Sequence, residues 1–288
     1  MIKTNKYNMR AKSMLFLSFL FIVIGIIYSC DTDETQTVAN FTELVMSDEF
    51  DTNGAPNSKI WNYNIGDGRA NGLPAGWGNN ELQYYTDRTE NVTVQNGVLI
   101  ITAREESFEN YNYTSARLLT KGKFDQTYGR FEARIKLPWG QGLWPAFWLL
   151  GDDSGGTEIW PQIGEIDIME YVGSDPTKVF GTVHGPGYSG GESIGKSYEL
   201  DGDRFDAGFH IFGIEWGPDY INYYVDDVLY NQITPEDVPG EWVFNRGPFY
   251  IILNLAVGGA LPGSPNEETV FPQNMLVDYV RVYKNNIN

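Results

Sequence analysis

Three acidic residues lie within one short segment of the chain, Gly164–Tyr171, which reads GEIDIMEY. In a regular β-strand alternate side chains share a face, so Glu165 and Asp167 would lie on one face and Glu170 on the other. Glu170 would then point into the core, where an unpaired carboxylate is costly. A one-residue bulge between Asp167 and Glu170 would return Glu170 to the face of the other two acids. The segment therefore predicts three carboxylates in a row on a bulged strand.

Close carboxylates of this kind can cleave a glycosidic bond. Two Glu side chains that lean toward each other can bring their carboxyl groups to about 5 Å, the separation found in retaining glycosidases. Carboxylates this close resist joint ionisation, so one can hold a proton for the leaving group while the other stays charged. An exposed acidic strand edge or a structural cation site is the alternative interpretation of the octapeptide on its own.

Aromatic side chains that suit sugar binding lie close to this segment in the sequence. In residues 142–150 (GLWPAFWLL), Trp144, Ala146 and Trp148 share one face of a strand, and the small Ala146 leaves room between the two indoles. Trp139 and Trp160 add further aromatic surface. Pyranose rings can stack their C–H faces on such flat rings, although packing in the core is the commoner role of any single tryptophan.

Polar residues that could bind sugar hydroxyl groups occur in two further places. Residues 77–85 read WGNNELQYY, and their polar members are poor core material and good hydroxyl ligands: Asn79, Asn80, Glu81 and Gln83. His184 begins a glycine-rich loop after a predicted strand, which suits the rim of a cleft. His210, next to an apolar run, is expected to be structural.

The remainder of the domain is patterned as short strands. Residues 128–136 (YGRFEARIK) alternate apolar and charged side chains, the period of a half-buried strand. Similar runs are Val98–Ala103, Val179–His184, Ile211–Trp216, Tyr220–Val225, Phe249–Ala256 and Met275–Tyr283. About 13–15 such strands predict an all-β jelly-roll sandwich of two antiparallel sheets, with one concave face open as a substrate cleft. A barrel is the structural alternative.

Composition and charge limit the possible partners. The 288 residues are 42% hydrophobic and 20% charged, which indicates one folded domain and excludes a disordered or collagen-like chain. The net charge is −18, from 20 basic and 38 acidic residues, and becomes −22 without the first 29 residues, which hold four of the basic ones. Such a surface repels nucleic acids and anionic head groups, so a neutral partner is expected.

The N-terminal region is predicted to direct export. Basic residues precede an apolar run, Met14–Tyr28, that is too short for an ordinary membrane span. Cys30, the only cysteine, follows it in a position that resembles the lipobox of bacterial lipoproteins. We therefore expect a lipoprotein signal peptide at 1–29, lipidation of Cys30, an acidic tether at 30–40 and a folded domain at 41–288. The protein would be lipid-anchored at the envelope or surface of a bacterium; an uncleaved signal anchor is the alternative.

From about residue 46 to residue 283 the chain resembles glycoside hydrolase family 16, and within it the laminarinase-like endo-β-1,3-glucanases. The stretches that carry the resemblance are WGNNELQYYT (77–86), ARLLTKGKFDQTYGRFEARIKLPWGQGLWPAFWLLG (116–151), IWPQIGEIDIMEYVG (159–173), TVHGP (182–186) and MLVDYVRVY (275–283). The two residues between Asp167 and Glu170 resemble the bulged motif of this branch. The resemblance implies a β-jelly roll with a concave cleft and hydrolysis with retention of configuration.

The same resemblance implies roles for individual residues. Glu165 would be the nucleophile, Glu170 the general acid/base, and Asp167 the residue that orients Glu165. Sugar contacts are implied for Asn80, Arg117, Trp144, Trp148, Trp160 and His184. A structural Ca²⁺ is implied at Glu49, the carbonyl of Gly97 and Asp278, with no cofactor for catalysis.

Three functions then compete. The first is a monomeric endo-β-1,3-glucanase whose partner is a laminarin-type β-glucan polysaccharide. The second keeps the family but takes mixed-linkage β-glucan or a sulfated galactan, and the negative charge argues against a sulfated chain. The third is a non-catalytic lectin or sensor. Binding alone does not need paired acids, so the intact set of Glu165, Asp167 and Glu170 argues against this third function.

Overall fold

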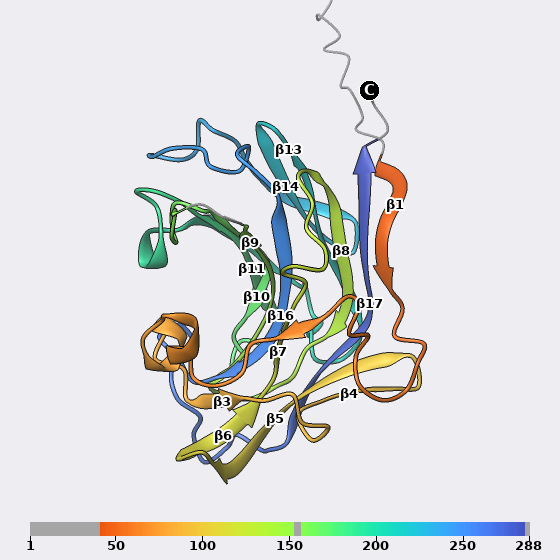
Figure 1. The fold of residues 1–288 in the computed structure, drawn as a ribbon, viewed down its shortest axis with the longest axis vertical. Helices are drawn as coiled ribbons and strands as arrows, with labels where there is room; N and C mark the ends of the chain where they lie inside the picture. Colours follow the sequence, from red (N-terminus) through yellow and green to blue (C-terminus); the bar gives the residue numbers. More distant parts are fainter. Residues whose placement is uncertain (1–40, 153–156, 286–288) are drawn as a thin grey trace, which may run out of the picture. The chain divides into compact units, whose positions relative to one another are not determined.

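The computed structural model of the chain describes residues 41–152 and 157–285. Two β-sheets are stacked face to face in these residues (Figure 1), which confirms the predicted sandwich. Helix in the described part is limited to three 3₁₀ turns: η1 (Arg69–Asn71), η2 (Ala75–Gly78) and η3 (Gly190–Glu192). This part contains no helix with the length and apolar character needed to cross a membrane. The predicted signal peptide, Cys30 and the tether at 30–40 lie outside the described residues.

The larger sheet has ten strands and contains most of the predicted ones. Its order is β15 (Val228–Ile233), β14 (Tyr220–Val225), β13 (His210–Gly217), β8 (Gly129–Lys136), β17 (Gln273–Asn285), β5 (Val98–Phe108), β6 (Tyr111–Ser115) and β3 (Gln83–Tyr85), with β1 (Phe41–Asp48) beside β17 and β4 (Val92–Gln95) beside β5. Strand β8 alternates as predicted, because Phe131 and Ile135 are buried while Arg130 and Arg134 are half-buried. One pair, β3 with β6, is parallel, which the sequence analysis did not predict.

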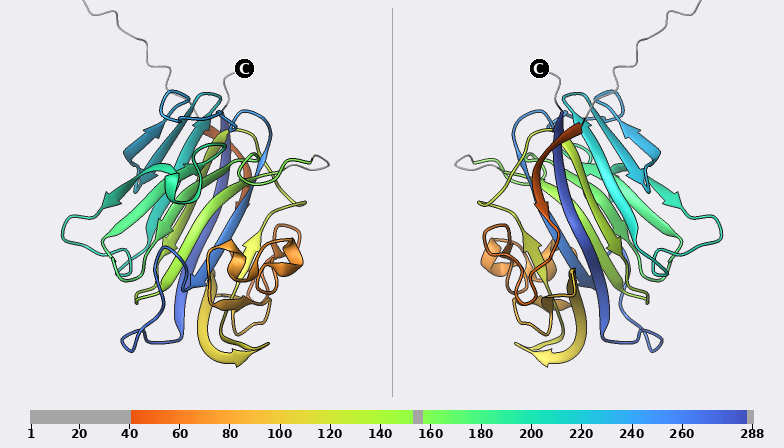
Figure 2. Two further views of the ribbon diagram at one scale, coloured as in Figure 1. Left: turned by 90° about the vertical axis from the view of Figure 1, so that its left-hand side faces the viewer. Right: turned by 90° about the vertical axis from the view of Figure 1, so that its right-hand side faces the viewer.

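The smaller sheet has seven strands and carries the acidic motif near its middle. Its order is β12 (Ile194–Glu199), β11 (Lys178–His184), β10 (Glu165–Tyr171), β9 (Leu143–Gly151), β16 (Phe249–Val257), β7 (Arg117–Leu119) and β2 (Asn62–Tyr63). Its inner face packs against the larger sheet in a core that includes Phe147 and Ile166. Its outer face is concave (Figure 1), and the left view of Figure 2 looks onto that face.

Cross-strand register determines which side chains are neighbours on the outer face. Arg117, Asn254, Ala146 and Glu170 form one row across β7, β16, β9 and β10. Trp148 pairs with Asp167 in the next position along β9 and β10. Directly opposed residues of antiparallel strands share a face. The sheet therefore places the predicted tryptophans and the predicted acids on one surface.

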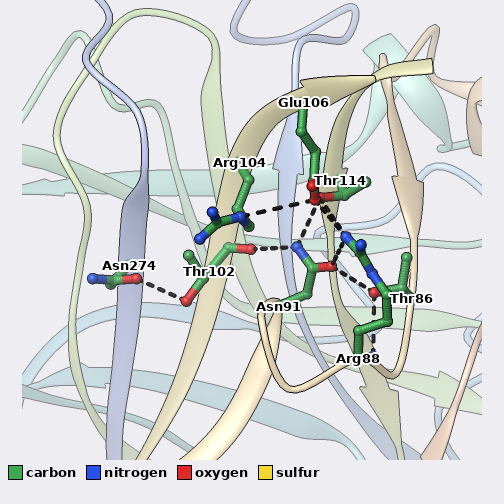
Figure 3. A network of polar contacts seen from close by, with 8 residues as sticks. All are labelled: Thr86, Arg88, Asn91, Thr102, Arg104, Glu106, Thr114 and Asn274. Atoms are coloured by element: carbon green, nitrogen blue, oxygen red, sulfur yellow. Dashed lines mark hydrogen bonds and ion pairs between the residues drawn. The ribbon is translucent and has the colours of Figure 1, made fainter. Parts of the chain in front are cut away.

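The segment between β2 and β3, which contains η1 and η2, lies beside this outer face (Figure 2, left). The backbone N–H of Leu82 attaches it to β16 by donating to the Val257 carbonyl at 2.7 Å. Beyond β3, a polar network secures the chain to β5 and β6 (Figure 3). Its centre is Arg88, which donates to Asn91 Oδ1 at 2.9 Å and pairs with Glu106. At the other end of the segment, the backbone N–H of Asn64 donates to the Arg117 carbonyl at 3.0 Å, so both ends are fixed to the sandwich.

Candidate active site

The bulge in β10 is present where the polarity of the motif predicts it. Against β9, Asp167 pairs with Trp148 and Met169 with Phe147, so β10 has one extra residue there. Against β11 the register shifts over the same residues, between Asp167 and Glu170. The apolar residues of the motif are buried in the core, whereas Glu165 and Glu170 are half-buried on the outer face. The predicted row of three acids is therefore confirmed as an arrangement in space.

The contacts of the three carboxylates show that they form one cluster. Glu170 Oε1 accepts a hydrogen bond of 3.1 Å from the indole N–H of Trp144. Thr182 in β11 donates its hydroxyl proton to Asp167 Oδ2 at 2.6 Å, and the same hydroxyl lies 3.5 Å from Glu170 Oε2. Asp167 is only 3% exposed, so it is more deeply buried than the two half-buried glutamates.

Burial and mutual repulsion govern the protonation of the two glutamates. Burial, followed by the negative charge of Asp167, raises the pKa of Glu170 to about 8. The same two causes raise the pKa of Glu165. Because carboxylates this close do not ionise together, the first to ionise determines the state of the other. His184 Nε2 lies 3.8 Å from Glu165 Oε1, and its positive charge favours an ionised Glu165 and thus a protonated Glu170.

His184 lies against the acids rather than at a distant rim. Its Nε2 is 3.1 Å from Asp167 Oδ2 and 3.8 Å from Glu165 Oε1. Burial lowers its pKa, but the hydrogen bond to Asp167 and the nearby acidic charges outweigh burial and raise the pKa to about 9. The backbone N–H of Gly190 approaches Nδ1 at 3.1 Å, a contact that only the neutral ring can accept. In either protonation state, Nε2 carries a hydrogen that faces Asp167.

The predicted sugar-binding aromatics lie around this cluster. Trp144 contacts Glu170, and Trp148 donates its indole N–H to Asn254 Oδ1 at 2.8 Å. Trp160 is 42% exposed, and its ring centre lies 6.0 Å from that of His184. These three rings are available to stack on a sugar beside the acids.

Arg117 and Asn80 differ in how far they can reach a ligand. The Arg117 guanidinium contacts two indoles, 4.6 Å from the centre of Trp77 and 4.8 Å from that of Trp148, and the residue is buried. Asn80 is exposed, at a positive φ of 59°. The carbonyl of the preceding Asn79 accepts a 2.8 Å hydrogen bond from Ala260, which brings this turn toward Trp144. Asn80 can therefore contact a ligand, while Arg117 mainly holds two aromatic rings together.

The interpretation of Glu81 and Gln83 as hydroxyl ligands is wrong. Glu81 is 7% exposed and Gln83 is 0% exposed. Their polar atoms are instead paired inside the protein: Gln83 donates to Glu81 Oε2 at 2.6 Å, and Gln83 Oε1 accepts from the backbone N–H of Val257 at 2.7 Å. Polar side chains can be buried when partners of this kind satisfy their hydrogen bonds. The local sequence does not show this, because Val257 is distant along the chain.

Two other residues, Trp216 and His210, have structural roles, as predicted for His210. Trp216 is fully buried in the core, and its indole N–H donates to the Phe244 carbonyl at 3.0 Å. His210 packs edge-on against Phe205 and contacts Asp226 at 2.7 Å on the larger sheet. Neither residue belongs to the cluster on β10.

The residues expected to bind calcium lie on the larger sheet. Glu49 follows β1, Asp278 is in the neighbouring β17, and Gly97 is in the turn between β4 and β5. Glu49 accepts two hydrogen bonds of 2.8 Å from Arg281, and Asp278 accepts one of 2.6 Å from Arg134. Carboxylate and carbonyl oxygens are donors that suit Ca²⁺, so the chemistry of the set fits, with both arginine contacts to be shared or released on binding.

A second group could hold a metal ion by geometry alone. Potential ligand atoms of Glu165, Asp167 and His184 all lie within 4.8 Å of one another. This is the one such group of three acidic, histidine or cysteine side chains in residues 41–152 and 157–285. It coincides with the paired-acid cluster, which can work without an ion.

Sequence reasoning missed two polar residues of the outer face. Thr182 lies two positions before His184 in β11, so the strand period alone places both side chains on one face. Asn254 is the only polar residue in β16 (FYIILNLAV), and a lone amide in an apolar strand is a signal that it has a specific partner. Both signals were available in the sequence.

Comparisons with known proteins agree with this geometry. The model of glycosyl hydrolases family 16 matches residues 79–281. The chain is 48% identical over 253 residues to a beta-glucanase from Rhodothermus marinus, covering 84% of this chain and 85% of that protein.

Two solved structures are similar in both sequence and fold. The catalytic domain of an endo-1,3-beta-glucanase (laminarinase) from Thermotoga petrophila RKU-1 is 52% identical, with a TM-score of 0.81, over 87% of this chain and 100% of that one. The laminarinase catalytic domain from Thermotoga maritima MSB8 is 53% identical, with a TM-score of 0.79, over 85% and 99%. Because the family match spans most of the folded domain and includes the whole acidic cluster, the chain belongs to glycosyl hydrolases family 16.

Proposed function

We propose that this protein is an endo-acting, retaining hydrolase of β-1,3-glucosidic bonds in laminarin-type β-glucans. The observation that carries the proposal is the bulge in β10, which sets Glu165, Asp167 and Glu170 on one face beside Trp144 and Trp148. The laminarinases and the beta-glucanase that share its sequence and fold favour a β-glucan as substrate. The net charge of −18 favours an uncharged polysaccharide over a sulfated one.

The reaction proceeds by two displacements at the anomeric carbon. In the first, Glu165 attacks this carbon while Glu170 gives its proton to the glycosidic oxygen, which leaves with the rest of the chain. Burial and the charge of Asp167 raise the pKa of Glu170 to about 8, which keeps that proton available near neutral pH. In the second, Glu170 takes a proton from water, and the resulting hydroxide displaces Glu165 with overall retention.

Asp167 acts on Glu165 rather than on the sugar. Its charge acts directly on Glu165, and the Thr182 hydroxyl and the Nε2–H of His184 hold it in place. Its negative charge is one cause of the raised pKa values of both glutamates. When Glu165 becomes an ester its charge is lost, repulsion falls, and Glu170 can act as a base.

A polysaccharide panel tests the proposal. Laminarin should give a ladder of oligosaccharides by size-separating chromatography, and NMR of the first products should show the β-anomer. Hydrolysis confined to mixed-linkage β-glucan would assign the runner-up substrate. Retarded migration in a glucan-containing gel without new reducing ends would instead assign a lectin.

We also propose a structural calcium site at Glu49, Gly97 and Asp278. Its support is the strand order, in which β17 lies between β1 on one side and β5, with its β4–β5 turn, on the other. Calcium at about one hundred times its Kd should add about 2.7 kcal/mol to the free energy of unfolding. The shift in Tm between CaCl₂ and EDTA should vanish in Asp278→Asn; an equal shift in this variant would remove Asp278 from the site.

We further propose export and lipid anchoring at Cys30, with the anchored enzyme acting as a monomer. The support is the N-terminal apolar run and the single cysteine that follows it. Labelled fatty acid should be incorporated into the full chain and lost in Cys30→Ser. Light scattering on the domain without residues 1–40 should give the mass of one chain.

A further inference from the structure

A buried carboxylate lies beside the sugar-binding face and outside the catalytic row. Glu81 follows η2 and has three side-chain donors: Asn79 to Oε1 at 3.3 Å, and Gln83 and Tyr85 to Oε2 at 2.6 and 3.2 Å. A charged group is rarely buried without such partners. The mechanism described above does not use it.

Glu81 is one end of a chain of hydrogen bonds, and its contacts determine which group donates and which accepts at each link. An ionised carboxylate can only accept, so the Tyr85 hydroxyl must donate to Glu81. Burial raises the pKa of Tyr85, and the side-chain amide of Asn254 opposes that rise, as a donor to the hydroxyl oxygen does. This oxygen can therefore accept from Asn254. With its NH₂ group used in this way, Asn254 turns its Oδ1 toward Trp148 and accepts the indole N–H at 2.8 Å.

Gln83 reinforces this direction at the start of the chain. Its side-chain oxygen accepts from the backbone N–H of Val257 at 2.7 Å, so its NH₂ group faces Glu81. A second donor at Oε2 favours the acceptor state of Glu81. Gln83, Tyr85 and Asn254 each have one orientation that satisfies every partner.

The far end of the chain lies at the catalytic cluster. Trp148 pairs with Asp167 across β9 and β10 and holds the Arg117 guanidinium against its ring at 4.8 Å. The same guanidinium lies 4.6 Å from the ring centre of Trp77, which is in turn 5.5 Å from that of Tyr85. The stack of Trp148, Arg117 and Trp77 is thus attached at both ends to residues that contact one another near Glu81.

We propose that Glu81 is a positioning residue for glucan binding: it sets the direction of the chain Glu81–Tyr85–Asn254–Trp148 and so fixes the Trp148 ring beside Asp167. This inference rests on the proposed function, because the ring is held for a sugar to stack on. An amide at position 81 can present its NH₂ group to Tyr85, which would reverse the chain and turn Asn254 away from Trp148.

The test compares two variants that break the chain at different points. Glu81→Gln removes its directing charge, and Tyr85→Phe removes one hydroxyl while keeping the ring that packs on Trp77. Loss of such a buried hydrogen bond corresponds to about a tenfold change in affinity. We expect each variant to raise KM for laminarin about tenfold with kcat little changed, because the lost interaction serves binding equally in ground and transition states.

Measuring the Kd directly distinguishes a positioning role of Glu81 from a general loss of protein stability. Calorimetry with laminaritetraose, in a Glu165→Gln background that prevents hydrolysis, should show Kd raised about tenfold by each variant. The double variant should be no weaker than either single variant, because both break one chain. Glu132→Gln is the matched control: it removes a buried carboxylate from the larger sheet and should leave Kd unchanged. A Tyr85→Phe variant with native KM and Kd would overturn the inference, even if Glu81→Gln failed to fold.

An NMR readout does not depend on the substrate. The indole N–H resonance of Trp148, assigned by its loss in Trp148→Phe, should move in Glu81→Gln and Tyr85→Phe but not in Glu132→Gln. If the unsubstituted protein neither bound nor cleaved laminaritetraose, the proposed function would fail. The Trp148 resonance alone would then test whether Glu81 positions Trp148, and a signal that did not move would disprove this role.

Discussion

Each outer face of the sandwich carries buried acidic side chains, but the partners of these acids differ between the two faces. On the larger sheet, Arg130 of β8 contacts Glu132 at 2.8 Å, Glu215 at 3.3 Å and Asp227 at 2.6 Å. On the smaller sheet, the charges of Glu165, Asp167 and Glu170 act on one another, and the partners of these acids are Thr182, Trp144 and His184. Strand β8 alternates regularly and β10 is bulged, yet each presents its acids on an outer face, and the difference is the supply of arginine. A carboxylate paired with arginine is held as an anion, whereas carboxylates that face one another compete for protons.

The pKa values follow this difference. Around Arg130, burial alone would lower the pKa of the guanidinium, but Glu132 and Asp227 raise it above its ordinary value. Around Asp167, burial and acidic charge raise the pKa values of Glu165 and Glu170. Arginine pairing on one face serves stability, and its absence on the other supplies a proton for chemistry.

The largest expected effect comes from removing either glutamate of the unpaired cluster. Glu165→Gln and Glu170→Gln should each lower kcat on laminarin by about 10³-fold or more, because one removes the nucleophile and the other the acid/base. Reducing-end assays measure the loss. Circular dichroism should show an intact fold, with Glu132→Gln as the active control. Near-native turnover in either glutamine variant would refute the roles assigned here.

The opposite result is expected on the paired face. Arg130→Met removes three ion pairs at once and leaves the buried Glu132 without its cation. Breaking a buried pair in this way should lower the free energy of unfolding by about 3 kcal/mol, measured by urea denaturation. The kcat of the folded fraction should not change. A loss of kcat without a loss of stability would mean that the two faces are functionally linked.

Much of this contrast could be predicted from the sequence. The bulge followed from the cost of burying Glu170, and the alternation of β8 followed from its period of two. Residues satisfied by distant partners could not be predicted. Glu81 and Gln83 are polar and near aromatics, and only the approach of Val257 and Tyr85 shows that they are buried. Strands of two or three residues, such as β2 and β7, have no periodicity to detect.

A smaller effect is expected at the donor that secures Asp167. Thr182→Val keeps the shape of the side chain but removes the 2.6 Å hydrogen bond to Asp167 Oδ2. Loss of a hydrogen bond to a charged group should lower kcat about tenfold or somewhat more, because Asp167 then orients Glu165 less well. Thr182→Ser retains a hydroxyl and should restore most of the activity. If serine were as impaired as valine, packing rather than hydrogen bonding would be the role of Thr182.

The smallest effect is a shift in the pH dependence of the unpaired cluster. Glu170 must be protonated to act, and its pKa is raised to about 8, so kcat/KM should fall as pH rises through that value. The Trp144 indole N–H stabilises the charged form of Glu170 and so lowers its pKa. Trp144→Phe removes that donor and should move the alkaline limb to higher pH by less than about one unit.

The matched control for this shift is Trp148→Phe. The indole N–H of Trp148 is donated to Asn254, so the substitution should weaken glucan binding without moving the alkaline limb. Profiles of kcat/KM from pH 5 to 10, each normalised to its own maximum, separate the limb from the loss of binding. A limb that moved to lower pH in Trp144→Phe, or moved equally in both variants, would show that this contact does not set the proton affinity of Glu170.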